Sequence, residues 1–314
     1  WDGGFLFHPD ERAILMTTND LAWPSITDLG VLFNVDESPL NPRWFPYGSF
    51  PLYVLKFVDT LISLFNDLGL VGLSRVGRVL SALADVATIY VVYLLARKLF
   101  DRRVGLLAAT FTTLAVIHIQ LSHFFAVDTF QTLFVVTSVY FMVRVALEER
   151  LHYSLLAGVF VALALATKVS SMPLLAPLVM AHVFSALRQA PIAAILSVRV
   201  PPVWWVAGRR LVYAGLTAMG VFFIAEPYAI LDFDQFWADV TEQSEMVRRI
   251  RDYPFTRQYV DTTPYVYHIK QLALFGLGLP LGLVAWAGLS YGTYAAIKRR
   301  SITLGVVLFF IVPF

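Results

Sequence analysis

The 314-residue chain contains no cysteine, which excludes a disulfide framework and any metal site built on thiolates. Charged residues are also scarce, at 15% of the chain against about a quarter in an average soluble domain. The absence of cysteine is compatible with any cellular compartment, so it gives no information about the redox environment of the protein. The shortage of charge, in contrast, excludes an ordinary soluble globular domain.

Nucleotide-binding signatures are missing as well. The sequence has no Walker A motif, no Gly-x-Gly-x-x-Gly motif and no soluble domain that would hold one. Any substrate or energy source must therefore come from the membrane or from outside the cell. We expect no nucleic-acid partner.

Hydrophobic residues make up 58% of the chain, and the mean hydropathy is +0.68. Long apolar runs match the thickness of a bilayer and predict membrane spans. The predicted spans are 79–98, 104–121, 126–147, 153–167, 171–187, 211–228, 271–293 and 301–314. The run at 153–167 is short, which predicts a helix that ends or breaks at the membrane surface.

Two further segments have a polar stripe rather than a uniformly apolar surface. In residues 51–70, Lys56, Asp59, Ser63 and Asp67 recur at three- and four-residue spacing. This pattern is typical of a helix that lies in the membrane interface. The stretch 232–252 is predicted to be a second amphipathic surface helix.

Basic residues cluster in alternate loops. The positive-inside rule places these loops in the cytoplasm. They contain Arg97, Lys98, Arg102, Arg103, Arg150, Arg188, Arg199, Arg209, Arg210, Lys298, Arg299 and Arg300. Most acidic residues fall on the other side, which brings the segments 1–78, 122–128 and 229–270 to one outer face together with Lys168.

These patterns predict an all-α fold, a polytopic transmembrane helical bundle with outer loops that carry interfacial helices. Residues 1–78 form an outer first loop, residues 79–228 a membrane core of about six spans, residues 229–270 a second outer loop, and residues 271–314 further spans. The chain opens on Trp1 without a signal-peptide pattern and stops within an apolar run. We therefore expect it to be a fragment.

The first polar motif, residues 8–11, reads His-Pro-Asp-Glu. Asp10 and Glu11 are adjacent, so they cannot share a helix face and can hold different partners. A carboxylate near lipid can have a raised pKa and act as a general base. The alternatives are an ordinary acidic loop or a helix that begins with Asp10 as its cap.

Two outer-face positions follow further along the chain. His123 and Asp128 lie where two spans are joined by almost no loop, and an acidic residue at the start of a membrane helix tends to be functional. The alternative for Asp128 is a helix cap. Lys168 ends an apolar run, where it would bind a phosphate or simply extend to lipid headgroups.

Other candidates lie at the outer ends of spans. Arg78 begins the first span, as a phosphate clamp or a membrane anchor. Glu226 and Tyr228 close the sixth span, where Pro227 stops the helix, and are candidates for a substrate pocket. His118 is expected to be a packed histidine rather than a ligand.

Several tracts together resemble a known family. They are HPDE in the first loop, FPYGSFPLY, RVLSALADVATIYVVYLLARKLF, HIQLSHFFAVDTF, ALATKVSSMPLLAP and EPYAILDFDQF. Their order and shared sidedness resemble the GT-C membrane glycosyltransferases of the dolichyl-phosphate-mannose protein mannosyltransferase type, which include the aminoarabinose transferases (glycosyltransferase family 39-like). The resemblance implies a GT-C fold whose first membrane helix is missing from this chain.

The resemblance also implies a reaction, in which a polyprenyl-phosphate sugar donates its sugar with inversion to an acceptor hydroxyl. Asp10 matches the family's catalytic base, Glu11 its neighbour and Asp128 its second acidic position. Lys168, with Arg78, would stabilise the departing phosphate. Protein, lipid and glycan acceptors all stay open, and we expect an extracytoplasmic active site in a prokaryotic plasma membrane.

No cofactor is required by the sequence. Members of the family differ in metal use, so a divalent ion held by Glu11 with His8 or His123 stays open.

The alternative function is a transporter or flippase for a lipid-linked or small anionic substrate. Transporters usually place polar residues near the bilayer midplane. Here the polar residues gather at one surface, Asp85 is the only acid well inside a predicted span, and no internal repeat is present. A non-catalytic lipid-binding scaffold is a third interpretation. We therefore favour the enzyme.

Overall fold

The structure is a computed structural model that describes residues 4–196, 200–263, 265–299 and 301–311. All the regular structure in these residues is helical, which confirms the predicted all-α class. The α-helices are α1 (Pro9–Asp20), α2 (Phe50–Ser63), α3 (Gly69–Leu99), α4 (Arg102–Thr113), α5 (Val116–Leu121), α6 (Val127–Glu148), α7 (Leu151–Leu165), α8 (Leu175–Leu187), α9 (Pro202–Ala225), α10 (Tyr228–Leu231), α11 (Phe233–Val247), α12 (Val266–Gln271), α13 (Leu279–Arg299) and α14 (Ile302–Ile311). Short 3₁₀ helices lie at Leu29–Phe33, Val169–Leu174, Ile192–Leu196 and Pro254–Tyr259, and a π turn at Leu272–Gly276.

Helix α6 forms the centre of the bundle and packs against α3, α7, α8 and α14. Its rings Phe134 and Phe141 both contact Phe160 of α7, at centroid distances of 6.3 and 5.6 Å. Helix α7 in turn packs on α9, where a side chain at Gly158 would lie 2.3 Å from the carbonyl oxygen of Ala214. Small residues thus let membrane helices approach closely, as is usual where water does not drive their association.

Three segments of the described chain are long and apolar enough to cross a membrane: α3, α6 and the combined run Val169–Leu187. The last consists of a 3₁₀ helix that leads into α8. The other predicted spans are shorter, more polar or interrupted. The eight predicted runs are therefore only partly reproduced as spans, and the run at 153–167 is a short helix, Leu151–Leu165, as expected.

The predicted span 104–121 is broken into α4 and α5 at Leu114 and Ala115. Threonines at the end of α4 donate their hydroxyl hydrogens to carbonyls four residues earlier, and such bonds bend helices. They are Thr110, Thr112 and Thr113. Non-helical backbone at membrane depth is tolerated where it lines a cavity or is buried in protein.

The predicted span 271–293 is also interrupted, because α12 passes through the π turn before α13 begins at Leu279. Gly278 has a φ of +80°, which favours glycine. Pro280 follows at the start of α13, where a missing N–H costs little.

Helix boundaries differ from the prediction in two places that matter for the site. Helix α3 begins at Gly69, ten residues before the predicted span, so Arg78 lies inside it and the interfacial helix α2 ends at Ser63. Helix α9 runs from Pro202 to Ala225, so Glu226 and Tyr228 follow the helix rather than belong to it. The predicted surface helix is observed as α11.

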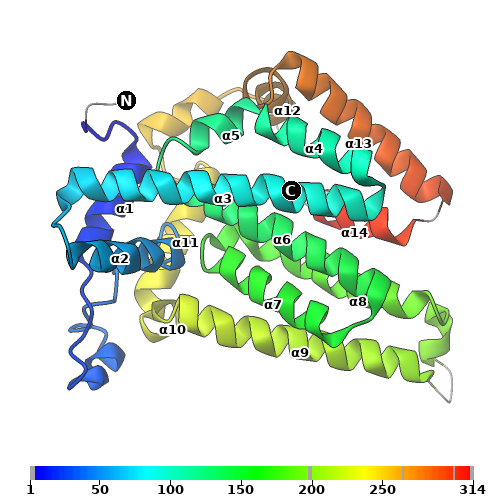
Figure 1. Ribbon diagram of the computed structural model, residues 1–314, viewed down its shortest axis with the longest axis horizontal. Coiled ribbons are helices and arrows are strands. Elements are labelled where there is room, and N and C mark those ends of the chain that lie inside the picture. The colour runs from blue at the N-terminus through cyan, green and yellow to red at the C-terminus, as the bar shows by residue number, and fades with distance from the viewer. Residues whose placement is uncertain (1–3, 197–199, 264, 300, 312–314) are drawn as a thin grey trace.

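The bundle has two chemically different ends (Figure 1). The N-terminal segment, α1, α2, α10 and α11 lie at the left end of the view, and the α3–α4 turn and the start of α9 lie at the right end. At the right end Lys98 pairs with Glu148 at 2.6 Å, and Arg188 donates to the carbonyl oxygen of Leu147. Arg199 and Arg300, two members of the predicted basic set, lie outside the described residues.

Candidate active site

The His-Pro-Asp-Glu motif forms the start of α1. His8 is the cap of this helix, because its Nδ1 accepts a hydrogen bond from the backbone N–H of Glu11 at 3.3 Å. Pro9 occupies the first turn, where proline is favoured. Asp10 is therefore not the cap. It is half-buried, whereas Glu11 is fully buried, so the two carboxylates point in different directions.

Glu11 is held in a buried network. Its carboxylate accepts two bonds from the Arg78 guanidinium, at 2.8 and 2.7 Å, and one from the backbone N–H of Phe125 at 2.9 Å. These contacts tie α1 to α3 and to the loop before α6. Such an arrangement favours a structural role for Glu11 and Arg78, rather than the catalytic and phosphate-binding roles expected from the sequence.

Asp10 lies near Tyr47, which comes from the loop before α2. The Asp10 carboxylate lies close enough to the Tyr47 phenol to affect its pKa. Burial, then the charge and hydrogen bond of Asp10, then the charge of Asp128 all raise the pKa of the Tyr47 phenol. The charges of two carboxylates that are more than a hundred residues apart in the sequence therefore both act on Tyr47.

Asp128 lies in the first turn of α6, where the helix dipole favours a negative charge. Its side chain does not cap the helix, so the capping interpretation is wrong. Lys168 approaches it from the end of α7, with Nζ 3.1 Å from Oδ1, and also lies 5.5 Å from the ring centroid of Tyr47. The structure therefore brings together Asp10, Tyr47, Asp128 and Lys168.

The backbone that carries Tyr47 is fixed against the end of α7. The N–H of Gly48 donates to the carbonyl oxygen of Thr167 at 3.0 Å, and the N–H of Phe50 donates to that of Ala166 at 3.2 Å. A side chain at Gly48 would lie 2.0 Å from the Ala166 oxygen, so only glycine fits there. These contacts place Tyr47 next to Lys168.

Glu226 holds the same segment from the opposite side. It is 1% exposed and accepts hydrogen bonds from the N–H and the hydroxyl of Ser49. Burial raises its pKa to about 8, although these bonds act in the other direction. Tyr228, also buried, bonds to Ser38 and to the carbonyl oxygen of Leu32. The polar groups of both predicted pocket residues are thus used to hold the outer loop.

A cavity of about 480 Å³ lies between the outer loop, the end of α7 and α11. Tyr47, Lys168 and Glu226 line it, and Arg248 at the end of α11 adds a second cation. The remaining wall is largely apolar and includes Phe45, Leu165, Phe236, Val240, Met246 and Val247. A cavity with cations beside apolar walls suits an amphipathic molecule with an anionic group.

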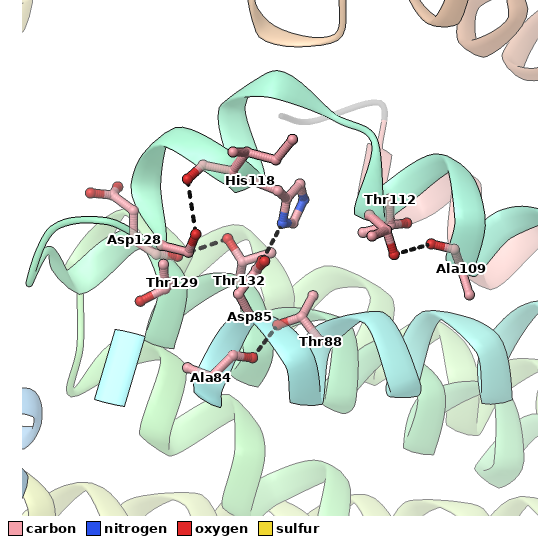
Figure 2. Close-up of polar contacts among 12 residues, drawn as sticks. Ala84, Asp85, Thr88, Ala109, Thr112, His118, Asp128, Thr129 and Thr132 are labelled. Carbon is pink, nitrogen blue, oxygen red and sulfur yellow. Dashed lines mark hydrogen bonds and ion pairs between the residues drawn. The ribbon is translucent and has the colours of Figure 1, made fainter. Parts of the chain in front are cut away.

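His118 and Asp85 form a second polar cluster within the bundle (Figure 2). The Nδ1 atom of His118 on α5 lies 2.5 Å from Oδ1 of Asp85 on α3, so the expected packed histidine has an acidic partner. A cavity of about 90 Å³ adjoins the pair and reaches Thr129 and Thr132 of α6. Thr132 donates to the backbone oxygen of Asp128 at 2.8 Å, which connects the cluster to the candidate site.

The residues expected to hold a metal do not form a ligand set. Glu11 is bound to Arg78, the Nδ1 atom of His8 accepts from Glu11 N–H, and the exposed His123 bonds to the backbone oxygen of Ile119. Among the described residues, no group of three or more histidine or acidic side chains could hold a metal ion. We therefore assign no step of a reaction to a metal.

The sequence interpretation did not single out Tyr47 or Ser49, whereas Arg248 belongs to the surface helix whose arginines it expected to face lipid phosphates or water. Tyr47 and Ser49 belong to the tract FPYGSFPLY, which contributed to the resemblance without a role for either residue. Aromatic and serine residues in a loop carry no distinctive spacing, and their roles depend on contacts with distant helices.

Comparison with known proteins gives one family match in sequence and a similar fold among solved structures. Residues 57–205, just under half of the chain, match the sequence profile of the dolichyl-phosphate-mannose-protein mannosyltransferase family. The fold is similar to that of the Archaeoglobus fulgidus oligosaccharyltransferase, crystallised with zinc and sulfate, with a TM-score of 0.51 and 16% sequence identity. The match covers 85% of this chain and 37% of the archaeal chain. No curated protein sequence matches the chain.

The chain is thus similar in sequence to a mannosyltransferase family over part of its length, and in fold to an oligosaccharyltransferase. Together with the apolar helices, these similarities point to an integral membrane protein. The matched range contains Asp128 and Lys168, whereas Asp10 and Tyr47 lie before it. The chain spans only about a third of the archaeal protein it resembles, which leaves donor and acceptor to be argued from the site.

Proposed function

We propose that the chain is the catalytic part of an inverting glycosyltransferase that takes its sugar from a polyprenyl-phosphate donor. The observation that carries the proposal is the cluster in which Lys168 lies against both Asp128 and the Tyr47 ring, with Asp10 near the same tyrosine. The cluster combines proton acceptors with a cation at one end of the bundle, beside an amphipathic cavity.

In the proposed reaction Asp10 is the general base. An acceptor hydroxyl is a weak nucleophile, so its proton passes to the Asp10 carboxylate as its oxygen attacks the anomeric carbon. The bond from that carbon to the phosphate oxygen breaks, and its electron pair leaves with the lipid phosphate. Attack opposite the leaving group inverts the anomeric centre.

Lys168 is the proposed partner of the departing phosphate, with Arg248 as a second cation on the same cavity. The phosphate gains charge as the bond breaks, and cations held near it stabilise that change. Asp128 pairs with Lys168 before the donor arrives and then faces the sugar. The apolar wall of the cavity accommodates the first part of the polyprenyl chain.

The proposal is tested with the full-length protein in lipid nanodiscs, supplied with a sugar-labelled polyprenyl-phosphate donor or with the matching nucleotide sugar. We expect transfer from the lipid donor alone, and a product whose anomeric configuration is opposite to that of the donor. Transfer from the nucleotide sugar alone, or retention of configuration, would contradict the proposal.

A further inference from the structure

Ser49 and Glu226 form a contact between two outer segments that are 177 residues apart. The hydroxyl of Ser49 donates to one carboxylate oxygen of Glu226 at 2.8 Å, and its backbone N–H donates to the other. Burial of a carboxyl group is costly unless it is hydrogen-bonded, so this contact is a specific feature of the fold.

The contact fixes a short piece of extended chain, residues 47–50, between two supports. On one side the end of α7 accepts the backbone bonds of Gly48 and Phe50. On the other side Glu226, which directly follows α9, holds Ser49. Tyr47 lies two residues before Ser49, with its ring 5.5 Å from Lys168 Nζ and its phenol near Asp10.

Both carboxylate oxygens of Glu226 are occupied by donors from the protein chain. Glu226 borders the cavity beside Lys168, but a carboxyl group engaged in this way is poorly placed to exchange a proton with a substrate. Its effect on the reacting groups has to pass through the segment that it holds.

We infer that Glu226 is a positioning residue, which through Ser49 holds Tyr47 in its place against Lys168 and near Asp10. The inference rests on the proposed function. A displacement of about 1 Å in a positioning group can cost on the order of 100-fold in rate, so a residue that touches no substrate can still control turnover.

The experiment is a double-mutant cycle in the full-length protein. Glu226→Ala and Tyr47→Phe are made singly and together, and kcat and KM for the polyprenyl-phosphate donor are measured for each. We expect Glu226→Ala to lower kcat on the order of 10- to 100-fold in the wild-type background and to have almost no further effect in the Tyr47→Phe background. Equal effects in the two backgrounds would overturn the inference.

Two conservative variants guard against loss of folding. Glu226→Gln keeps an oxygen acceptor and a group that can bond to the Ser49 hydroxyl, so it should recover most of the lost kcat. Ser49→Ala keeps the backbone bond and should give an intermediate loss. If Glu226→Gln loses as much kcat as Glu226→Ala, the inference is wrong. Glu37→Ala, which changes an exposed carboxylate of the same outer loop, is the matched control.

A second measurement does not depend on transfer. Amide hydrogen exchange of the peptide that contains residues 45–50 should be at least about tenfold faster in Glu226→Ala, because local opening of this segment is then easier. Exchange in Glu226→Gln should remain close to that of the wild type. Unchanged exchange in Glu226→Ala would contradict the positioning role even if the wild type transfers sugar. Absence of transfer by the wild type would instead contradict the proposed function.

Discussion

Lys168 forms an ion pair with Asp128, with 3.1 Å between Nζ and Oδ1, across the gap between the end of α7 and the start of α6. About a third of each side chain remains exposed, at 32% and 36%. The pair is therefore open enough to separate when a stronger anion arrives. A phosphate is such an anion, and the cavity that Lys168 lines leads to the same ammonium group.

Lys168→Ala should reduce kcat/KM for the lipid donor on the order of 100-fold, because a cation that faces developing negative charge is lost. Stability should change by less than about 1 kcal/mol, since a partly exposed pair contributes little. Donor kinetics and thermal unfolding of the purified protein measure the two effects. Lys56→Ala, which removes a pair on α2, is the control. Unchanged donor kinetics would contradict the role of Lys168.

Loss of the Glu11–Arg78 pair should, in contrast, lower stability strongly and affect donor kinetics little. Arg78→Ala leaves the Glu11 carboxylate buried without its cation, a change that typically costs about 3–5 kcal/mol. The unfolding temperature should therefore fall strongly. Replacement of both residues by apolar side chains should recover part of the loss. If Arg78→Ala unfolds like the wild type but weakens donor binding, Arg78 contacts the phosphate after all.

Gly48→Ala should disrupt the site through sterics alone. The added methyl group would lie 2.0 Å from the backbone oxygen of Ala166, so the segment that carries Tyr47 must move. We expect transfer to fall at least tenfold and the unfolding temperature to drop. Gly208→Ala is the matched control, because a side chain there meets no atom within 4 Å. Equal activity of the two variants would show that the position of Tyr47 is unimportant.

Glu226 should make stability depend on pH. Its pKa rises from 4.5 to about 8 on burial, so between these values the folded state binds more protons than the unfolded state. Stability therefore falls as pH rises through this window and levels off above it. The pKa values of the neighbouring Tyr53 and Tyr228 are also raised, so both stay neutral there. Thermal unfolding from pH 4.5 to 9 should show a smaller decline for Glu226→Gln, and equal slopes would contradict the assignment.

Much of the fold follows from the hydrophobic pattern. The central helix α6 was predicted at 126–147 and is observed at Val127–Glu148, because a long apolar run between polar ends has no other stable conformation in a bilayer. The breaks at Leu114 and near Gly278 were not predicted. They depend on hydrogen bonds from threonine side chains to the backbone and on a left-handed glycine, within runs that are largely apolar.

The candidate site was partly predictable. Asp10 is half-buried and Glu11 is fully buried. This difference agrees with the sequence, because adjacent residues cannot share one face of a helix. The pairing of Glu11 with Arg78 could not be foreseen, because it depends on how α1 packs on α3. Tyr47 was overlooked for a similar reason. Its position results from two backbone bonds to α7 and a side-chain clamp from Glu226, and none of these leaves a sequence pattern.

The central claim is that Asp10 removes the proton from the acceptor hydroxyl. Asp10→Asn in the full-length protein is nearly isosteric and should lower kcat on the order of 10²- to 10⁴-fold, the usual contribution of a general base. Donor KM should change little, because Lys168 and the cavity are intact. Single-turnover transfer from a saturating labelled donor measures this most directly. A rate that matches the wild type would show that Asp10 is not the base and would contradict the account.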